Sequence, residues 1–202
     1  MSLDNTDERI MNAAIRLILA QGVKKTNLAD IAEEAGVTRV TVYRYFGDKK
    51  GLLRGICQRI AAVFQKAAEG DASDSVRDVD LRLNNLGKEL SMLPQGDLLT
   101  RLDEINRLHP DVYEEFRAAR QDAVDRLFQQ ALMAATQERA LRDGLNQQVL
   151  KAIFLAAVMG LIENPAIISS NVSLTEVFAT VTEVFRHGII KDSDEGATND
   201  QP

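Results

Sequence analysis

The sequence predicts an all-α protein, with an N-terminal three-helix domain built around a helix-turn-helix and a larger C-terminal helical domain. Apolar residues recur every three or four positions through most of the chain, which is the spacing of one buried helix face. Only 4 prolines and 12 glycines interrupt 202 residues, fewer breaks than a strand-and-turn architecture needs. With 45% hydrophobic and 27% charged residues, the chain can bury a sizeable core.

The helix-turn-helix is expected between residues 27 and 46. Asn27 is placed to cap a helix over 28–35, and Thr38 to cap a second helix over 38–46. Between them lies Gly36, where a tight turn can use positive φ without a steric clash. In the second helix the residues expected to pack inward are Val37, Phe46 and one of Val40 and Val42.

The other helices follow from the same periodicity and from the breaks between them. They are expected at 7–21, 47–68, 76–93, 97–108, 111–140, 145–164 and 173–188. The breaks lie at Leu93-Pro94-Gln95-Gly96, His109-Pro110, Asp143-Gly144 and Asn164-Pro165. We therefore divide the chain into an N-terminal domain (1–50), a helical body (51–190) and a polar tail (191–202) that is expected to be disordered.

Charge is distributed unevenly along the chain. The formal net charge is −6, yet residues 36–54 carry five basic side chains and a single acidic one. A short basic patch on an acidic body suits a protein that binds specific DNA without coating all DNA. Charge alone leaves an ordinary solvated surface as an equally good interpretation.

The outward side chains of 38–46 are of the types that contact DNA. Arg39 matches the guanine edge, and Thr41 matches either a thymine methyl group or a polar base edge. The side chains suited to phosphate oxygens are those of Thr38, Tyr43, Arg44 and Lys49. Lys49 also lies near a helix start, which favours an anion.

At this point the segment resembles the DNA-binding domain of the TetR family of bacterial regulators. The matching residues are Ile31-Ala32, Ala35-Gly36-Val37-Thr38, Thr41-Val42-Tyr43-Arg44-Tyr45-Phe46, Lys49 and Leu52, within about Arg9 to Arg59. Val40 departs from the family pattern, which often has glycine or another small residue there. The residues that the resemblance assigns to DNA contact are Asn27, Thr38, Arg39, Thr41, Tyr43 and Lys49.

The resemblance also implies a homodimer that places two reading heads on a palindromic operator. The C-terminal domain would bind a small-molecule effector of unknown identity and form the dimer, and the effector would release the DNA. We accordingly predict a ligand-responsive transcriptional regulator and favour a repressor, while an activator stays open because release and recruitment use the same reading head. The competing interpretation is a helical enzyme or a partner-binding protein that retains a vestigial DNA-reading domain.

Residues for the effector and for the dimer are predicted within the body. The predicted pocket residues are Leu102, Phe116, Phe128, Met133, Phe154 and Met159. The predicted dimer contacts are Ala152, Ala156, Gly160, Val177, Val181 and Phe185. The first three recur every four residues, so a second helix can approach closely along that ridge. Acidic residues of the body also raise the possibility of a cationic effector.

Other chemistry has little support in the sequence. Two histidines and one cysteine, far apart along the chain, make a poor metal-ligand set, and we expect no metal, no cofactor and no catalytic residues. Cys57 is expected to be a buried thiol. The polar N-terminus and the single cysteine indicate a cytoplasmic protein, and no apolar run is long enough to cross a membrane.

Overall fold

The computed structural model describes residues 6–71, 73–92, 98–170 and 172–190. The helices in these residues are α1 (Thr6–Gln21), α2 (Leu28–Glu34), α3 (Arg39–Phe46), α4 (Lys49–Ala67), α5 (Val76–Met92), α6 (Leu98–Leu108), α7 (Pro110–Gln137), α8 (Gln147–Ile162), α9 (Pro165–Ser169) and α10 (Leu174–Ile189). Pairing of the β type within the described ranges is limited to one isolated bridge, between Leu141 and Ile190. The all-α prediction is confirmed, whereas the predicted break at 93–96 and the predicted tail at 191–202 lie outside the described residues.

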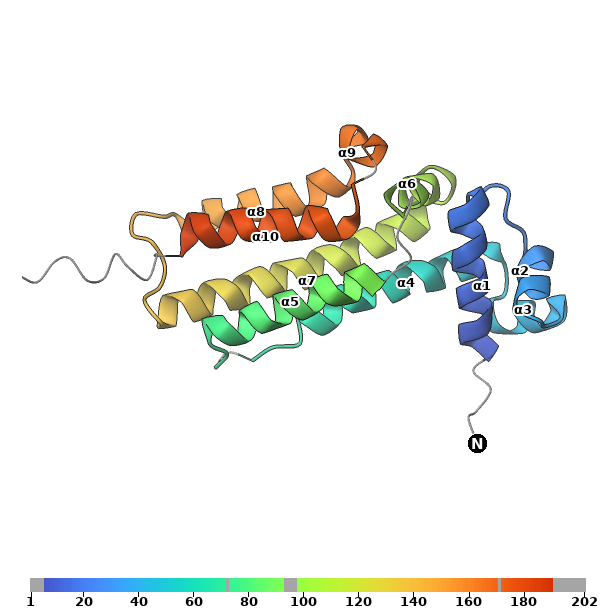
Figure 1. Ribbon diagram of the computed structural model, residues 1–202, viewed down its shortest axis with the longest axis horizontal. Helices are drawn as coiled ribbons and strands as arrows, with labels where there is room; N and C mark the ends of the chain where they lie inside the picture. Colours follow the sequence, from blue (N-terminus) through green and yellow to red (C-terminus); the bar gives the residue numbers. More distant parts are fainter. Residues whose placement is uncertain (1–5, 72, 93–97, 171, 191–202) are drawn as a thin grey trace, which may run out of the picture.

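The molecule is elongated, with the helix-turn-helix at one end (Figure 1). Helices α4, α5 and α7 run along the body and pack against one another, and α8 and α10 pack over them. Helices α1–α3 stand at the far end, and α6 lies between α1 and the body. We call α1–α3 together with the first turn of α4 the reading domain.

Capping residues and one glycine shape the reading domain as the sequence predicts. Asn27 accepts hydrogen bonds from two backbone N–H groups of α2, and Thr38 accepts one from the Thr41 N–H of α3. Gly36 has φ +64, and a Cβ there would lie 3.1 Å from Nη2 of Arg9. Any other residue at this turn would be strained and crowded.

A single continuous core joins the reading domain to the body. It extends from Ile10 in α1 to Val181 in α10 without a gap between the two parts. Helix α4 connects them, because it begins in the reading domain and its buried stripe continues along α7 to Phe64. The boundary drawn at residues 50 and 51 therefore falls inside one continuous helix.

Two helix ends differ from the predicted ones. Helix α7 stops at Gln137 rather than near 140, because Arg139 adopts φ +55 and the Ala140 N–H bonds back to the Ala135 carbonyl. After the predicted break at Asn164-Pro165, the chain forms the short helix α9, with Asn164 as its cap and Pro165 in its first turn.

Cys57 lies on the buried face of α4, as predicted, with 2% of its surface exposed. Burial, with a smaller contribution from the negative charge of Glu115, raises the pKa of the thiol to about 12. The thiolate is the nucleophile in thiol chemistry, so this environment suppresses the reactivity of Cys57.

We expect native Cys57 to resist alkylation by iodoacetamide at pH 8. The unfolded thiol titrates near ~8.5, so its reaction should be faster by roughly three orders of magnitude. The control is the chain unfolded in guanidinium chloride, followed by mass spectrometry. The free energy of unfolding should also fall as the pH rises above about 8.5, because there only the unfolded thiol ionises. Rapid alkylation of the native protein would contradict the buried, protonated state.

Arg120 is a fully buried charge in the middle of α7, with no exposed surface. Its Nη2 donates to Glu163 Oε1 over 3.4 Å, and its guanidinium carbon lies 5.0 Å from the centre of the Phe116 ring. Its Nε and Nη1 have no hydrogen-bond partner among the described residues. Tyr113 donates to the same Glu163 carboxylate over 3.2 Å. The arginine is thus under-satisfied, and Glu163, 38% exposed, is its counter-charge.

Two single substitutions separate the roles of this pair. Glu163→Gln leaves Arg120 buried without a counter-charge and should lower the free energy of unfolding by about 1–2 kcal/mol. Arg120→Met removes the buried charge and leaves a solvent-reachable glutamate, so its stability should stay within about 1 kcal/mol of wild type or exceed it. Urea denaturation at one fixed protein concentration measures both, and the reverse order would refute this account.

Candidate nucleic-acid interface and ligand cavity

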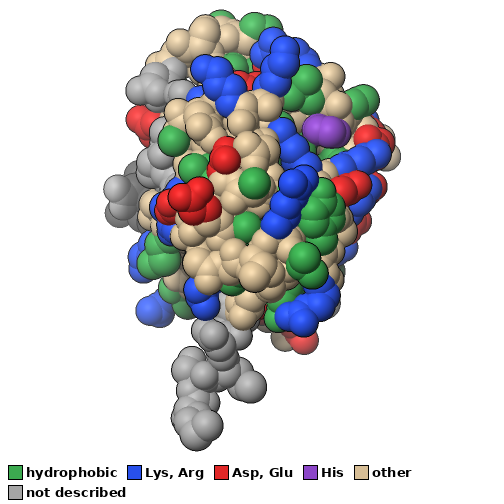
Figure 2. Space-filling model, turned by 90° about the vertical axis from the view of Figure 1, so that its right-hand side faces the viewer, with side chains coloured by type: hydrophobic (Ala, Val, Ile, Leu, Met, Phe, Trp, Pro, Cys, Tyr) green, Lys and Arg blue, Asp and Glu red, His purple; other side chains and the backbone are tan. Residues whose placement is uncertain are grey.

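Helix α3 is anchored by one buried side chain and presents the others outward. Val42 is fully buried, whereas Val40 is 77% exposed, so Val42 is the inward residue of the two that the sequence left open. Arg39, Tyr43 and Arg44 are also exposed. Figure 2 looks onto this end of the molecule, and Lys and Arg side chains are spread over the surface it shows. The outward side of α3 is free of other protein within the described chain.

Two arginines of α3 are held over neighbouring aromatic rings. Arg39 donates from Nη2 to the Tyr43 hydroxyl over 3.2 Å, with its guanidinium carbon 5.5 Å from the ring centre. Arg44 lies 5.3 Å from the centre of the Tyr45 ring. These contacts restrict each arginine to fewer rotamers before binding, so that less side-chain entropy is lost when it binds a partner.

Three of the polar residues predicted to contact DNA also have local structural roles. The Asn27 side chain caps α2 and donates to Asp30 over 2.7 Å. Thr38 caps α3, and its hydroxyl lies 2.8 Å from that of Thr41. All three lie at the surface of the reading domain, with Thr41 half-buried.

The basic residues after α3 are divided between the reading surface and the body. Lys49 begins α4, where its Nζ lies 3.5 Å from the Lys24 carbonyl oxygen, and burial lowers its pKa. Lys50 instead pairs with Asp111 over 2.7 Å, and Arg54 pairs with Glu115 over 2.7 Å. Two of the five positive charges counted in the sequence therefore bind α7.

These ion pairs belong to a polar junction between the reading domain and the body. The Arg54 guanidinium holds the pKa of Glu115 below its usual range. The Val23 N–H also donates to the Glu104 carboxylate of α6 over 2.7 Å. Gly22, with φ +90, allows this approach, because a Cβ there would lie 3.1 Å from a Glu104 oxygen. The junction fixes how the reading domain sits on α6 and α7.

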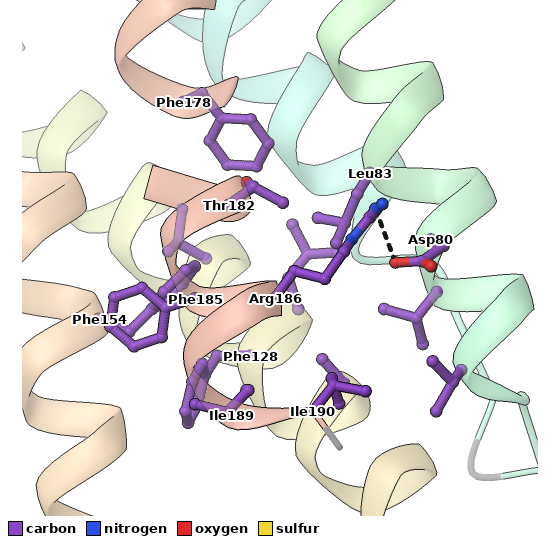
Figure 3. Close-up of a pocket in the computed structure, with 15 residues that line it drawn as sticks. Asp80, Leu83, Phe128, Phe154, Phe178, Thr182, Phe185, Arg186, Ile189 and Ile190 are labelled. Carbon is purple, nitrogen blue, oxygen red and sulfur yellow. Dashed lines mark hydrogen bonds and ion pairs between the residues drawn. The ribbon is translucent and has the colours of Figure 1, made fainter. Parts of the chain in front are cut away.

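The body contains an apolar cavity of about 170 Å³ between α5, α7, α8 and α10 (Figure 3). One wall is an aromatic cluster in which the Phe128 and Phe154 rings stack at 4.9 Å and Phe185 meets Phe154 edge-on at 4.9 Å. On the opposite side, Arg186 of α10 donates to Asp80 of α5 over 3.0 Å. The cavity is therefore apolar with one polar side.

Only part of the predicted pocket set lines this cavity. Phe128 and Phe154 do, whereas Leu102 and Phe116 are buried in the core elsewhere. Met133 is 46% exposed, and the Met159 sulfur lies 3.3 Å from Arg120 Nη2. The lining residues that the prediction missed include Asp80, Phe178, Thr182 and Arg186. The sequence feature that could have indicated this cavity is Arg186, a charged residue within the apolar stripe of 173–188.

The predicted dimer residues also divide into two groups. Ala152, Ala156 and Gly160 lie exposed along α8, as a contact ridge requires. Val177 and Val181 are each 5% exposed and belong to the core of the chain itself, and Phe185 lines the cavity. The apolar side chains that α8 and α10 expose instead are Val149, Ile153 and Val184, at 54%, 52% and 65%.

The acidic residues that suggested a cationic ligand are engaged elsewhere. Glu114 pairs with Arg117, Asp122 with Arg126, and Asp125 with Lys151. None of them lines the cavity. The described residues contain no group of three metal-ligating side chains and no helix long and apolar enough to cross a membrane.

Comparison with known proteins identifies the N-terminal part. Residues 10–56 match the family model described as bacterial regulatory proteins, tetR family. The chain is 39% identical over 75 residues to the HTH-type transcriptional regulator TtgR of Pseudomonas putida, which is 37% of this chain and 35% of that protein. It is 33% identical over 81 residues to AcrR of Shigella flexneri, covering 37% and 38%. The matches thus span little more than a third of the length of these relatives, both of which are named as transcriptional regulators.

Solved structures extend the likeness to the whole fold. SmeT, the repressor of the Stenotrophomonas maltophilia multidrug efflux pump SmeDEF, superposes with a TM-score of 0.66 at 23% identity and covers 98% of both chains. A TetR transcription regulator from Haloarcula marismortui superposes with a TM-score of 0.69 at 20% identity, over 94% of this chain and all of that one. Residues 10–56 are thus similar to the DNA-binding part of the tetR family of bacterial regulatory proteins, and the whole chain shares its helical fold with these two regulators.

Proposed function

We propose that this protein is a transcriptional repressor that binds a palindromic operator as a homodimer and is released by a small-molecule effector. The observation that carries the proposal is the outward side of α3, which presents Arg39, Val40 and Tyr43 at the end of the molecule. A helix that projects in this way fits the major groove of DNA, while α2 lies across the DNA backbone. Such a protein acts in the cytoplasm, on the chromosome, and no catalytic role is proposed for it.

The contacts divide by chemistry into base reading and phosphate binding. Arg39 matches guanine O6 and N7, and the exposed Val40 offers methyl groups to the C5-methyl of thymine. Asn27, Thr38, Tyr43, Arg44 and Lys49 suit phosphate oxygens, which fix the register without reading sequence. Thr41, half-buried beside Thr38, is the weakest of the predicted base contacts.

The dimer is proposed to form through α8 and α10. The exposed ridge of Ala152, Ala156 and Gly160 lets a second helix approach closely, and the exposed Ile153 and Val184 supply apolar surface beside it. A two-fold axis here would pair each helix with its own copy and give a four-helix contact. Two copies of α3 would then read half-sites about 34–36 Å apart.

Release by an effector is supported by a contact between one cavity-lining residue and α4. Phe178 of α10 lines the cavity, and its ring meets Phe64 of α4 edge-on, with centroids 6.2 Å apart. Helix α4 then runs to Lys49 in the reading domain. A ligand that binds better to one placement of Phe178 shifts the population toward that placement of α4. SmeT, which shares the fold, has been solved as a complex with triclosan, and this supports a small-molecule site in the body.

DNA binding is tested by fluorescence polarisation with duplexes from upstream of the protein's own gene and of neighbouring genes. At least one should bind far more tightly than random duplex. Arg39→Ala should cost about 1–3 kcal/mol at one base pair and relax the preference there. Lys49→Ala should weaken binding to all sequences alike and reduce the slope of log K against log salt by about one.

Arg77→Ala is the matched control, because it removes an exposed positive charge from α5, away from the reading domain. It should leave both the base preference and the salt slope unchanged. Binding no tighter than to random duplex, across all such regions, would defeat the proposed function. A change of base preference in Lys49→Ala would show that the contacts were divided wrongly.

The dimer is tested by Ala156→Glu, which places a charge on the ridge of α8. Wild type should sediment at twice the 22.3 kDa chain mass, whereas the variant should shift to the monomer at micromolar concentration. Ala118→Glu introduces the same charge at an exposed alanine of α7 and should remain dimeric. If both variants behave as dimers, the contact lies elsewhere on the molecule.

A further inference from the structure

Two residues that line the cavity each carry a buried polar atom without a hydrogen-bond partner among the described residues. Thr182 Oγ1 and Arg186 Nε both belong to lining residues of α10, and neither has a hydrogen-bond partner among the described residues. An unmade hydrogen bond at a buried donor is costly, so a ligand that supplies an acceptor here gains more than one that meets only apolar side chains. Figure 3 shows both side chains on the same side of the cavity, across from Phe154 and Phe185.

The charges beside these atoms cancel. Arg186 Nη2 lies 3.0 Å from Asp80 Oδ1, with both side chains 37% exposed, and these two are the only charged residues among the lining residues described. An anionic ligand would be attracted by the arginine and repelled by the aspartate, and it would lose its hydration on entering an apolar space. A cationic ligand would be attracted by the aspartate and repelled by the arginine. The pair therefore favours a ligand that carries no net charge.

A hydroxyl group fits this polar side in both directions. Its oxygen can accept from Arg186 Nε or from the Thr182 hydroxyl, and its proton can be donated to the Asp80 carboxylate. A ketone or ether would only accept, and a carboxylate would bring its charge against Asp80. The arrangement selects a neutral donor–acceptor group.

The opposite wall favours an aromatic ring. Phe128, Phe154 and Phe185 already pack by offset stacking and edge-to-face contacts, with ring centroids 4.9 to 6.5 Å apart. A planar ring that enters the cavity can continue the same contacts. A cavity of about 170 Å³ is also of the order that admits a small aromatic molecule.

We propose that the effector is an uncharged aromatic molecule with a single hydroxyl head group, seated with the hydroxyl at Asp80, Thr182 and Arg186 and the ring against the phenylalanine cluster. This inference deepens the proposed function by naming the chemical class that the body binds, and binding itself is measured without DNA.

The test compares 2-naphthol, naphthalene and 2-naphthoate at pH 7 on the full chain. The chain has no tryptophan, so naphthol fluorescence is read directly and the other two are measured by displacement. We expect 2-naphthol to bind about fivefold more tightly than naphthalene, which is within the contribution of one net hydrogen bond. We expect 2-naphthoate to bind at least about tenfold more weakly than 2-naphthol, because its charge is repelled by Asp80 and loses part of its hydration in the apolar cavity.

Two threonines of α10 provide a matched pair of variants. Thr182→Val removes the unsatisfied hydroxyl inside the cavity and should bring the preference for 2-naphthol over naphthalene close to one. Thr175 also has a buried hydroxyl oxygen without a partner, but it does not line the cavity. Thr175→Val should therefore keep the full preference. Thr182→Ser, which keeps the hydroxyl, should also retain it and guards against a misfolded variant.

Three results would overturn the proposal. Tighter binding of 2-naphthoate than of 2-naphthol would mean that the cavity prefers a carboxylate ligand. Equal binding of 2-naphthol and naphthalene would mean that Asp80, Thr182 and Arg186 make no hydrogen bond to the ligand. If none of the three probes binds, small aromatic molecules are excluded as the ligand class. Polarisation with operator DNA keeps the two claims apart: DNA binding without naphthol binding sinks this inference alone, and naphthol binding without DNA binding sinks the proposed function.

Discussion

The packing of α4 along α7 is the constraint on which the arrangement of the molecule depends. One end of α4 begins at Lys49 beside α3, and the other carries Phe64 against the cavity wall. Its apolar stripe is part of a core that runs unbroken from α1 to α10. Close-packed interiors move between discrete arrangements and do not bend continuously. A change at the Phe64 end therefore has to reposition the helix as a unit, and the reading domain with it.

The polar contacts at the junction work differently from this core. The Lys50–Asp111 and Arg54–Glu115 ion pairs lie at the surface, where the partners exchange readily with water, and the Val23–Glu104 hydrogen bond is partly buried. They contribute little to overall stability, yet each has a fixed geometry that orients the reading domain on α6 and α7. A joint that is apolar inside and ionic outside can hold one orientation and still release it at a modest cost in free energy.

The sequence predicted the local features of this fold, because helix caps, turns and faces are encoded within a few residues. Asn27, Gly36 and Thr38 fulfil their expected roles, whereas the choice between Val40 and Val42, which the sequence left open, is settled by the burial of Val42. The end of α7 could not be foreseen, since Arg139 takes a left-handed conformation usually assigned to glycine. The cavity was also hidden, because its polar side joins Asp80 to Arg186 across 106 positions of the chain.

The two faces of α10 show why its apolar stripe was hard to assign and why it matters. Periodicity identifies a wide apolar arc but not what covers it. In the structure Val177 and Val181 are covered by their own subunit and Phe178 and Phe185 border the cavity, whereas Val184 remains exposed. The same holds for α8, where Phe154 faces the cavity and Ala156 faces outward. Because both helices proposed for the dimer contact are also cavity walls, a ligand that displaces them would act on the placement of the two subunits as well as on α4. The separation of the reading heads would then respond to the effector by two routes that share one cavity.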